Sequence, residues 1–380
     1  MPSVAVGAGS AITPTRAGRD TNVYVASMTD FRPAEQMITQ DWGRLAGWLA
    51  EQGMKLDAQP TPRQFSGGLA NLNYLVSVDG REVVLRRPPA GPAAEGANDM
   101  AREWRVLTGL AGGYALAPAP IAYCEDATVL GVPFQVIEYR SGRPVGARLP
   151  DWIATLPNVG DRVTDETLRA MAGLHELDPE SLGLGALGRP DGFLARQVEG
   201  WARRSTAAFE GREPATVAPI LRALRADVPN PDRVSLLHCD FKPDNILFDT
   251  GSGGGLSPVA VIDWDMATLG DPLFDLGVLL SYWVQPGDPE PVLGLNQVPS
   301  LEPGFPSRAE VAERYLAMSD RPAVDLGFYL ILGRFRLAIA WQQLFLRYRR
   351  GSLIDPRYED FGSLAEAILE WTADTLGEPA

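Results

Sequence analysis

The spacing of hydrophobic residues changes near residue 140, and this change divides the chain into two parts. Short extended runs dominate residues 59–139: one precedes the glycine turn Ser66-Gly67-Gly68, and others cover 73–78, 82–87, 121–124 and 133–139. Asp79-Gly80 lies between the second and third runs, and an Asp-Gly pair flanked by such runs predicts a β-hairpin. The helical spacing of apolar positions over residues 95–110 predicts one helix between two groups of strands.

Residues outside this region follow other patterns. Residues 1–30 are rich in Ala, Gly, Thr and Ser without a sustained period, which predicts a mobile arm. The apolar positions that begin after Ala34 have helical spacing up to Gly53 and predict one leading helix. Beyond Leu149 the chain is mostly helical, with helices predicted over 163–175, 193–209, 217–224, 272–284, 308–318, 324–348 and 358–376. Six prolines between 286 and 306 predict an extended loop there.

Composition excludes several classes of protein. The 380 residues are 45% hydrophobic, which fits a globular protein long enough for two lobes. A net charge of −14 argues against nucleic acid or an anionic membrane as partner. Two histidines cannot build a multi-histidine metal site, and two distant cysteines fit a reducing cytoplasm. We find neither a secretory signal nor an apolar run of about 18 residues, so we expect a cytoplasmic protein.

The segment from Leu236 to Asp265 carries the candidate chemistry. A short apolar run ends in His238-Cys239-Asp240, a second run follows Asn245, and a third ends at Asp263. Three short strands would therefore deliver two carboxylates and one amide to neighbouring strand ends. A phosphoryl-transfer site needs these groups, because one Asp orients the accepting hydroxyl while an amide and a carboxylate hold Mg²⁺.

This segment resembles the catalytic and metal-binding motifs of the protein-kinase-like superfamily. Residues 238–245 fit the pattern His-x-Asp-x-x-x-x-Asn, and Asp263-Trp264-Asp265 stands where protein kinases have Asp-Phe-Gly. Within the superfamily the chain resembles the aminoglycoside phosphotransferase and choline kinase-like family of small-molecule kinases. Residues 84–89, 263–272 and 335–340 are similar to the kinase-like domains associated with acyl-CoA dehydrogenases.

The resemblance implies an α+β, bilobal, protein-kinase-like fold. The N-lobe, 31–139, would contain the leading helix, a five-stranded antiparallel sheet and one further helix, and would bind the nucleotide. The helical C-lobe, 140–380, would carry the catalytic and metal residues and the acceptor site, while 1–30 would form the flexible arm. We leave the oligomeric state open.

The resemblance also assigns roles to residues of the segment. Asp240 would be the general base, and Lys242 would stabilise charge on the transferring phosphate. Asn245 and Asp263 would bind Mg²⁺ through hard oxygen atoms. His238 would hold the loop by hydrogen bonds, and Asp265 would support either the metal or the acceptor. Asp271 and Asp275 would cap and anchor the helix that follows them.

The nucleotide, ATP or GTP, is expected to contact residues of the N-lobe. Ser66, Gly67 and Gly68 would cover its phosphates; the alternative is an ordinary hairpin turn. Arg86 would take the place of the kinase lysine and pair with Glu103; the alternative is that Arg86 and Arg87 are exposed at a strand end. Glu138 and Tyr139 would lie in the hinge beside the nucleobase, or form a plain linker.

We therefore expect an ATP-dependent phosphotransferase whose acceptor is the hydroxyl of a metabolite, for example a hydroxyacyl-CoA. The alternatives are an aminoglycoside or choline-type kinase, and a nucleotide-binding pseudokinase without turnover. The proline-rich loop, 286–306, is either a determinant of acceptor specificity or a surface insertion.

Overall fold

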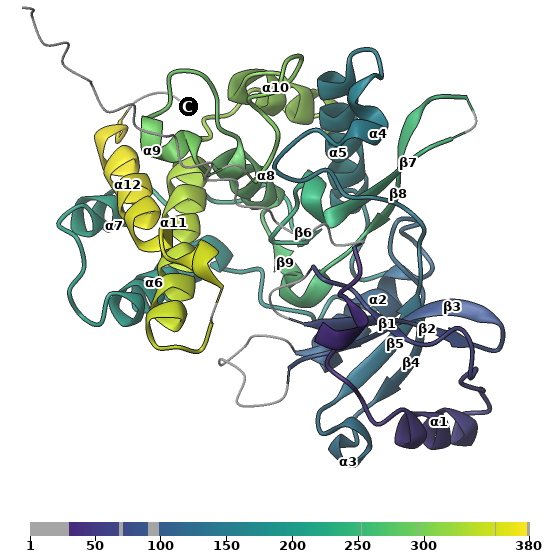
Figure 1. The fold of residues 1–380 in the computed structure, drawn as a ribbon. Coiled ribbons are helices and arrows are strands. Elements are labelled where there is room, and N and C mark those ends of the chain that lie inside the picture. The colour runs from purple at the N-terminus through teal and green to yellow at the C-terminus, as the bar shows by residue number, and fades with distance from the viewer. Residues whose placement is uncertain are drawn as a thin grey trace, which may run out of the picture.

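A computed structural model describes residues 30–67, 71–89, 99–251, 253–295, 297–353 and 355–377 (Figure 1). The predicted arm therefore lies outside the described residues apart from Asp30, and so does Gly68. The chain has the predicted α+β, bilobal, protein-kinase-like fold, with the sheet at the lower right of Figure 1 and most helices at the upper left. The boundaries of the arm and the two lobes stay a prediction.

The N-lobe is built on one antiparallel sheet with the strand order β1-β2-β3-β5-β4. Its strands are β1 (Arg63–Gln64), β2 (Leu72–Val78), β3 (Arg81–Arg87), β4 (Pro120–Cys124) and β5 (Phe134–Glu138). Asp79 and Gly80 both have positive φ, 50° and 74°, as a two-residue hairpin loop requires. All four strand runs predicted after the glycine turn are confirmed to within one or two residues.

The two faces of this sheet have different partners because side chains alternate along each strand. Val83 and Leu85 of β3 pack with Leu45 and Leu49 of helix α1 (Trp42–Glu51), which covers the outer face. Val84 and Arg86 therefore lie on the opposite face. That face meets helix α2 (Met100–Leu110), so the alternation directs Arg86 toward the interior between the lobes.

The single leading helix predicted up to Gly53 is wrong in its first half. Residues Ala34–Gln36 form only a 3₁₀ turn, and α1 begins after Asp41, whose side chain accepts the N–H of Arg44 at 2.9 Å. Before that cap the chain runs beside β1, where Arg32 N–H donates to the carbonyl of Gln64 at 2.8 Å. Edge pairing and the Asp cap thus override the helical spacing.

The C-lobe is mainly helical. Its long helices are α5 (Val159–His175), α6 (Phe193–Ala208), α7 (Val217–Ala226), α8 (Pro272–Tyr282), α10 (Arg308–Met318), α11 (Gly327–Arg349) and α12 (Phe361–Asp374). The lobe also contains two short antiparallel ribbons. In one, β6 (Ser235–Leu237) pairs with β9 (Thr268–Gly270), and in the other β7 (Ile246–Thr250) pairs with β8 (Leu256–Val261). Short helices of this lobe are α4 (Asp151–Ala154) and α9 (Glu290–Leu293), the second of which interrupts the loop expected to be extended; α3 (Ala127–Leu130) lies in the N-lobe between β4 and β5. Across the described residues, no helix is both long and apolar enough to cross a membrane.

Helices α8 and α11 cross at a pair of glycines. A Cβ atom on Gly277 would lie 2.6 Å from the carbonyl oxygen of Tyr329, and one on Gly333 would lie 2.5 Å from the carbonyl oxygen of Gly277. The absence of both side chains lets the two backbones approach closely. This contact fixes α11 against α8, and both helices carry residues that reach the catalytic loop.

We predict that Gly333→Ala lowers the free energy of unfolding by about 1–3 kcal/mol, because the added methyl group overpacks this crossing. Gly47→Ala is the control, since Gly47 lies within α1 and its Cβ would meet nothing within 4 Å. That change should stabilise the protein by about 0.4–1 kcal/mol through the unfolded state. Denaturant titration measures both variants, and equal effects in the two would contradict the close crossing.

Candidate active site

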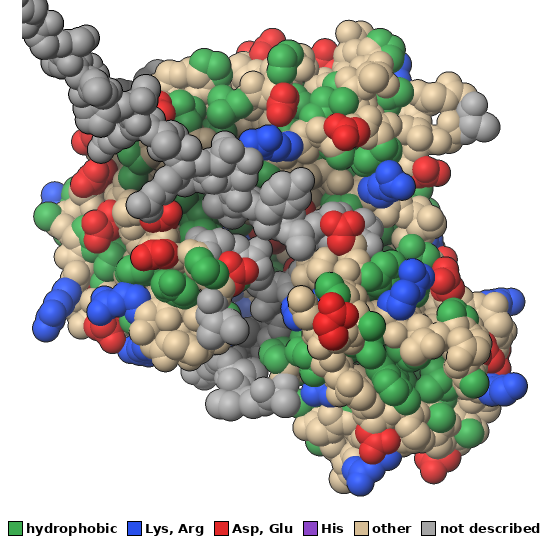
Figure 2. All heavy atoms as spheres, in the orientation of Figure 1, with side chains coloured by type: hydrophobic (Ala, Val, Ile, Leu, Met, Phe, Trp, Pro, Cys, Tyr) green, Lys and Arg blue, Asp and Glu red, His purple; other side chains and the backbone are tan. Residues whose placement is uncertain are grey.

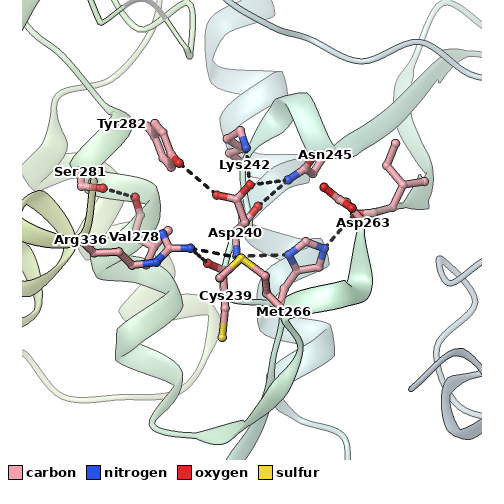
Figure 3. A network of polar contacts seen from close by, with 12 residues as sticks. Cys239, Asp240, Lys242, Asn245, Asp263, Met266, Val278, Ser281, Tyr282 and Arg336 are labelled. Atoms are coloured by element: carbon pink, nitrogen blue, oxygen red, sulfur yellow. Dashed lines mark hydrogen bonds and ion pairs between the residues drawn. The ribbon is translucent and has the colours of Figure 1, made fainter. Parts of the chain in front are cut away.

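The catalytic loop begins where β6 ends, and its backbone is held from two helices. Cys239 has φ 68°, a left-handed conformation that is unfavourable for a residue other than glycine. Asp275 of α8 accepts the N–H groups of His238 and Cys239 at 2.8 Å each. Arg336 of α11 donates through Nη2 to the carbonyl of Cys239 at 2.6 Å (Figure 3). These contacts hold the strained residue that precedes Asp240.

The predicted cap is confirmed for Asp271, whereas Asp275 anchors α8 to the catalytic loop without capping it. Asp271 caps α8 by accepting the N–H of Leu273 at 3.0 Å. Asp275 instead lies inside α8, fully buried, and binds the catalytic loop. It also contacts His175 Nε2 at 3.2 Å, and His175 Nδ1 lies 2.7 Å from the hydroxyl of Tyr315 on α10. Asp275 is therefore the centre of a buried polar network.

His238 connects the catalytic loop to the end of β8, which supports its predicted structural role. Its Nε2 lies 2.9 Å from the carbonyl oxygen of Ile262, so this nitrogen carries the proton and donates. Burial lowers the pKa of His238, which keeps the ring neutral. Because Ile262 directly precedes Asp263, this bond brings the second motif to the first.

Asp240 is surrounded by three hydrogen-bond donors (Figure 3). Its Oδ2 accepts from Lys242 Nζ at 2.5 Å and from Asn245 Nδ2 at 3.0 Å, and its Oδ1 accepts from the hydroxyl of Tyr282 at 3.1 Å. Burial opposes the charge, but Lys242 and Arg336 hold the pKa of Asp240 below its ordinary value. The carboxylate is therefore ionised at neutral pH and fixed in orientation.

The Asp240 carboxylate shifts the pKa values of both Lys242 and Tyr282. Burial alone would lower the pKa of Lys242, but the Asp240 charge raises it above its ordinary value. Burial and the Asp240 charge raise the pKa of Tyr282 to about 12, so the phenol keeps its proton and donates. Lys55 and Lys242 are the only lysines among 34 basic residues. A compact ammonium group is thus placed here in a chain that otherwise uses arginine.

Asn245 and Asp263 lie next to each other, as the sequence predicted (Figure 3). Asn245 donates its Nδ2 to the carbonyl oxygen and to Oδ2 of Asp240, which directs its amide oxygen away from that residue. Asp263 has φ 70°, and its Oδ1 accepts from Arg86 Nη2. Burial and the Asp263 charge raise the pKa of Asp265 to about 8. The two neighbouring carboxyl groups and the amide oxygen are the hard donors that suit Mg²⁺.

The residues present therefore fit a magnesium ion that is completed by a ligand. Among the described residues no group of three or more His, Cys, Asp or Glu side chains is arranged to hold a metal by itself. Mg²⁺ typically binds through one or two carboxylates together with substrate phosphates and water. Asn245 and Asp263 would supply the protein oxygen atoms.

Arg86 joins the two lobes. Its Nε donates to Glu103 Oε2 of α2 at 2.8 Å, its Nη1 to Asn73 Oδ1 at 3.3 Å, and its Nη2 to Asp263. Burial favours the neutral form, but the Glu103 and Asp263 carboxylates raise the pKa of Arg86. The Arg86–Glu103 contact is thus present as expected. The alternative of exposed arginines is wrong, since Arg86 and Arg87 are 6% and 5% exposed.

A cleft with about 710 Å³ of empty volume opens between the lobes and extends to Asp263. Its inner wall is apolar and is formed by Val84, Leu107, Ile137, Leu247 and Ile262. Glu138 and Tyr139 line it, as expected for the hinge, together with Arg86 and Glu103. The apolar walls suit the flat faces of a nucleobase, with Arg86, Glu103 and Asp263 at the end where phosphates would lie.

Two of the cleft-lining residues, Phe65 and Tyr139, belong to an aromatic stack. Phe31 stacks on Phe65 at 4.7 Å between ring centroids, and Phe65 on Tyr139 at 6.4 Å. Ser66 donates its N–H and its hydroxyl to the carbonyl of Asp30, at 2.7 and 2.9 Å. Ser66 and Gly67 are not among the cleft-lining residues, so their phosphate-binding role stays a prediction. The same holds for Gly68, which lies outside the described residues.

Sequence reasoning missed Tyr282 and Arg336 as residues of the site. Tyr282 is the last residue of α8, and Arg336 lies in the middle of α11, distant in sequence from the catalytic loop. Helical periodicity identifies such positions only as buried. The usable signal was a charged residue inside the otherwise apolar run 335–340.

The fold and the site together define a protein-kinase-like phosphotransferase. A sequence model of the phosphotransferase enzyme family, APH, matches residues 61–311. The chain therefore belongs to this family.

Two relatives with similar sequences are named as members of the acyl-CoA dehydrogenase family. Acyl-CoA dehydrogenase family member 11 of Gallus gallus is 30% identical over 317 residues, which are 81% of this chain and 39% of that protein. Family member 10 of Mus musculus is 27% identical over 312 residues, covering 82% of this chain and 29% of that protein. The chain thus spans about a third of the length of these relatives, and the resemblance to kinase-like domains of acyl-CoA dehydrogenases is confirmed.

Solved structures share the fold. A candidate aminoglycoside phosphotransferase from Ralstonia eutropha is 26% identical with a TM-score of 0.71, covering 90% of this chain and 100% of the other. An aminoglycoside phosphotransferase bound to ADP and hygromycin B is 17% identical with a TM-score of 0.55, covering 88% of this chain and 99% of the other. The second likeness is evidence for the fold alone.

We predict that Asp275→Asn lowers the free energy of unfolding by about 2–4 kcal/mol, because the amide nitrogen would face one of two backbone donors now bound by carboxylate oxygens. Asp249→Asn is the matched control, since Asp249 is exposed on β7. Its change should stay within about 0.5 kcal/mol. Denaturant titration compares the two variants. An Asp275→Asn protein as stable as the control would contradict a stabilising role for the hydrogen bonds from Asp275 to the catalytic loop.

Proposed function

We propose that this chain is an ATP-dependent kinase that transfers the γ-phosphoryl group of the nucleotide to a hydroxyl group of a metabolite. The observation that carries the proposal is the position of Asp240, which three donors fix beside Asn245 and the cleft-lining Asp263. Nucleotide binding, hydroxyl orientation and phosphate stabilisation can therefore take place in one continuous site.

The N-lobe and the β7–β8 ribbon would bind the nucleotide. Val84 on one side and Leu247 and Ile262 on the other give two apolar surfaces for the base. Arg86, kept ionised and oriented by Glu103, would contact the phosphates. Magnesium bound by Asn245 and Asp263 would neutralise charge on the phosphates.

Asp240 would act on the acceptor. Its carboxylate accepts a hydrogen bond from the hydroxyl and so directs the oxygen lone pair toward the γ-phosphorus. As the new O–P bond forms and the bond to ADP breaks, the hydroxyl proton moves to Asp240. Because the pKa of Asp240 is low, this transfer comes late, when the attacking oxygen has become acidic. Lys242 would stabilise charge on the transferred group.

Two observations guide the choice of acceptor. The relatives named acyl-CoA dehydrogenase family members favour a hydroxylated acyl thioester or similar metabolite. Structures in complex with hygromycin B or kanamycin keep an aminoglycoside as the alternative.

On the face seen in Figure 2 the acidic side chains are spread over the surface and form no single patch. The net charge of −14 therefore gives no separate reason to expect a cationic acceptor.

We predict that Asp240→Asn reduces acceptor-stimulated ADP release by about 10²–10⁴-fold, because the amide cannot accept the proton. A coupled ADP-release assay against hydroxyacyl-CoA thioesters, other hydroxylated metabolites and aminoglycosides measures this, with Asp249→Asn as the charge-matched control. Unchanged release in Asp240→Asn would contradict the assigned base. Nucleotide binding without turnover of any acceptor would favour a pseudokinase.

The two lysines permit a direct test of the phosphate end of the cleft. An acyl-phosphate analogue of ATP acylates a lysine close to its terminal phosphates, so Lys242 should be labelled in the presence of Mg²⁺. Excess ATP should suppress the labelling, and Asp263→Ala should abolish it. Lys55 is exposed before β1 and serves as the internal reference, to be labelled equally in every sample. Equal labelling of both lysines, insensitive to ATP, would exclude this nucleotide site.

A further inference from the structure

A buried arginine lies beside the catalytic loop without a carboxylate partner. Arg336 is 5% exposed, and its Nη2 contacts the carbonyl of Cys239 at 2.6 Å and the sulfur of Met266 at 3.7 Å. Within the described part of the chain, no acidic side chain reaches ion-pair distance of this guanidinium. Asp240, the nearest acid along the loop, is already bound by Lys242. The charge of Arg336 is therefore only partly compensated.

A second arginine and a tryptophan from α6 complete a cluster with Arg336. The guanidinium carbon of Arg204 lies 4.8 Å from the ring centre of Trp201, and that of Arg336 lies 5.6 Å from it. Trp201 is 7% exposed, and its indole N–H is buried with no hydrogen-bond partner in the described residues. Partial burial and the charges of Arg203 and Arg336 lower the pKa of Arg204, so these cations repel one another.

Such an arrangement is costly unless something else completes it. A buried donor without an acceptor costs about 1–3 kcal/mol, and a buried cation without an anion costs more. The cost is unexpected in a chain with 48 acidic and 34 basic residues, which has an excess of carboxylates for pairing. An anionic ligand would satisfy the indole N–H and the guanidinium groups together.

Arg336 of this cluster lies on the side of Asp240 away from the proposed nucleotide cleft. Figure 3 shows Arg336 and Tyr282 on one side of Asp240, and Asn245 and Asp263 on the other. The proposed nucleotide cleft ends at Asp263, so the side facing α8 and α11 remains for the acceptor.

We propose that Trp201, Arg204 and Arg336 form an anion subsite for the phosphoryl acceptor, which binds a phosphate or carboxylate group of the molecule whose hydroxyl meets Asp240. The inference rests on the proposed function. It specifies the acceptor class: an anionic hydroxylated compound is bound, and a polycationic aminoglycoside is repelled. Arg336 has two tasks, because it also positions the backbone before Asp240.

The first experiment is independent of catalysis. In a ¹H–¹⁵N TROSY spectrum of the full chain without nucleotide, the Trp201 indole signal is identified by its loss in Trp201→Phe. Inorganic phosphate and acetate are titrated separately at constant ionic strength, with chloride as the reference. We expect a saturable shift of this signal with at least one of the two anions, and the comparison distinguishes a phosphate from a carboxylate site.

Arg204→Gln should weaken this binding about tenfold, since one charge-assisted contact is lost. Arg204 is exposed, so the variant is expected to fold. Arg222→Gln removes the same charge from the exposed surface of α7 and should bind like the wild type. A Trp201 signal that does not respond to either anion, or that responds equally in both variants, overturns the proposal.

The acceptor screen separates this proposal from the proposed function. If ADP release is stimulated by anionic acceptors, and Arg204→Gln raises their KM about tenfold with little change in kcat, both proposals are supported. If a cationic or neutral acceptor is used with equal efficiency in wild type and Arg204→Gln, the chain is a kinase without this subsite. If no acceptor is used while the Trp201 signal still saturates with an anion, the kinase proposal fails and the anion site stands.

Discussion

One buried carboxylate, that of Asp275, determines the geometry of the catalytic loop. It binds two successive backbone N–H groups and so holds Cys239 in a conformation that costs about 1–3 kcal/mol. Arg336 holds the carbonyl of the same residue from α11. The position of Asp240 therefore depends on how α8 and α11 pack, and the close crossing at Gly277 and Gly333 makes that packing rigid.

Arg86 has a comparable function between the lobes. A lysine could offer one ammonium group, whereas the guanidinium of Arg86 contacts Glu103, Asn73 and Asp263 with three different nitrogen atoms. The strand, helix α2 and the proposed metal ligand are thereby joined through one side chain. Protein kinases have a lysine at this position, which is a mobile point charge. Arg86 instead forms a fixed connection between the lobes.

The sequence was informative where chemistry follows local spacing. Asp240, Asn245 and Asp263 could be predicted because each directly follows or precedes a short apolar run, and Arg86 because strand alternation placed it on the inner face. Tyr282 could not, and Arg336 left only the signal of a charge in an apolar run, because helices far apart in the chain bring them to the loop. For Asp275 only the predicted cap was wrong, since a carboxylate in the first turn of a helix commonly interacts with that helix, whereas Asp275 binds the catalytic loop. The prediction of one leading helix was wrong in its first half, because the chain there pairs with β1 instead of following its helical periodicity.

The stack of Phe31, Phe65 and Tyr139 bears on where the functional unit of this chain begins. The family match starts at residue 61, yet Phe31 stacks on the cleft-lining Phe65, and the carbonyl of Asp30 holds Ser66 at the first residue of the glycine turn. A recombinant protein that begins at residue 61 would keep Asp240, Asn245, Asp263 and Arg336 and lose one layer of this aromatic stack. The family match and the contacts that support the proposed nucleotide cleft therefore begin at different residues.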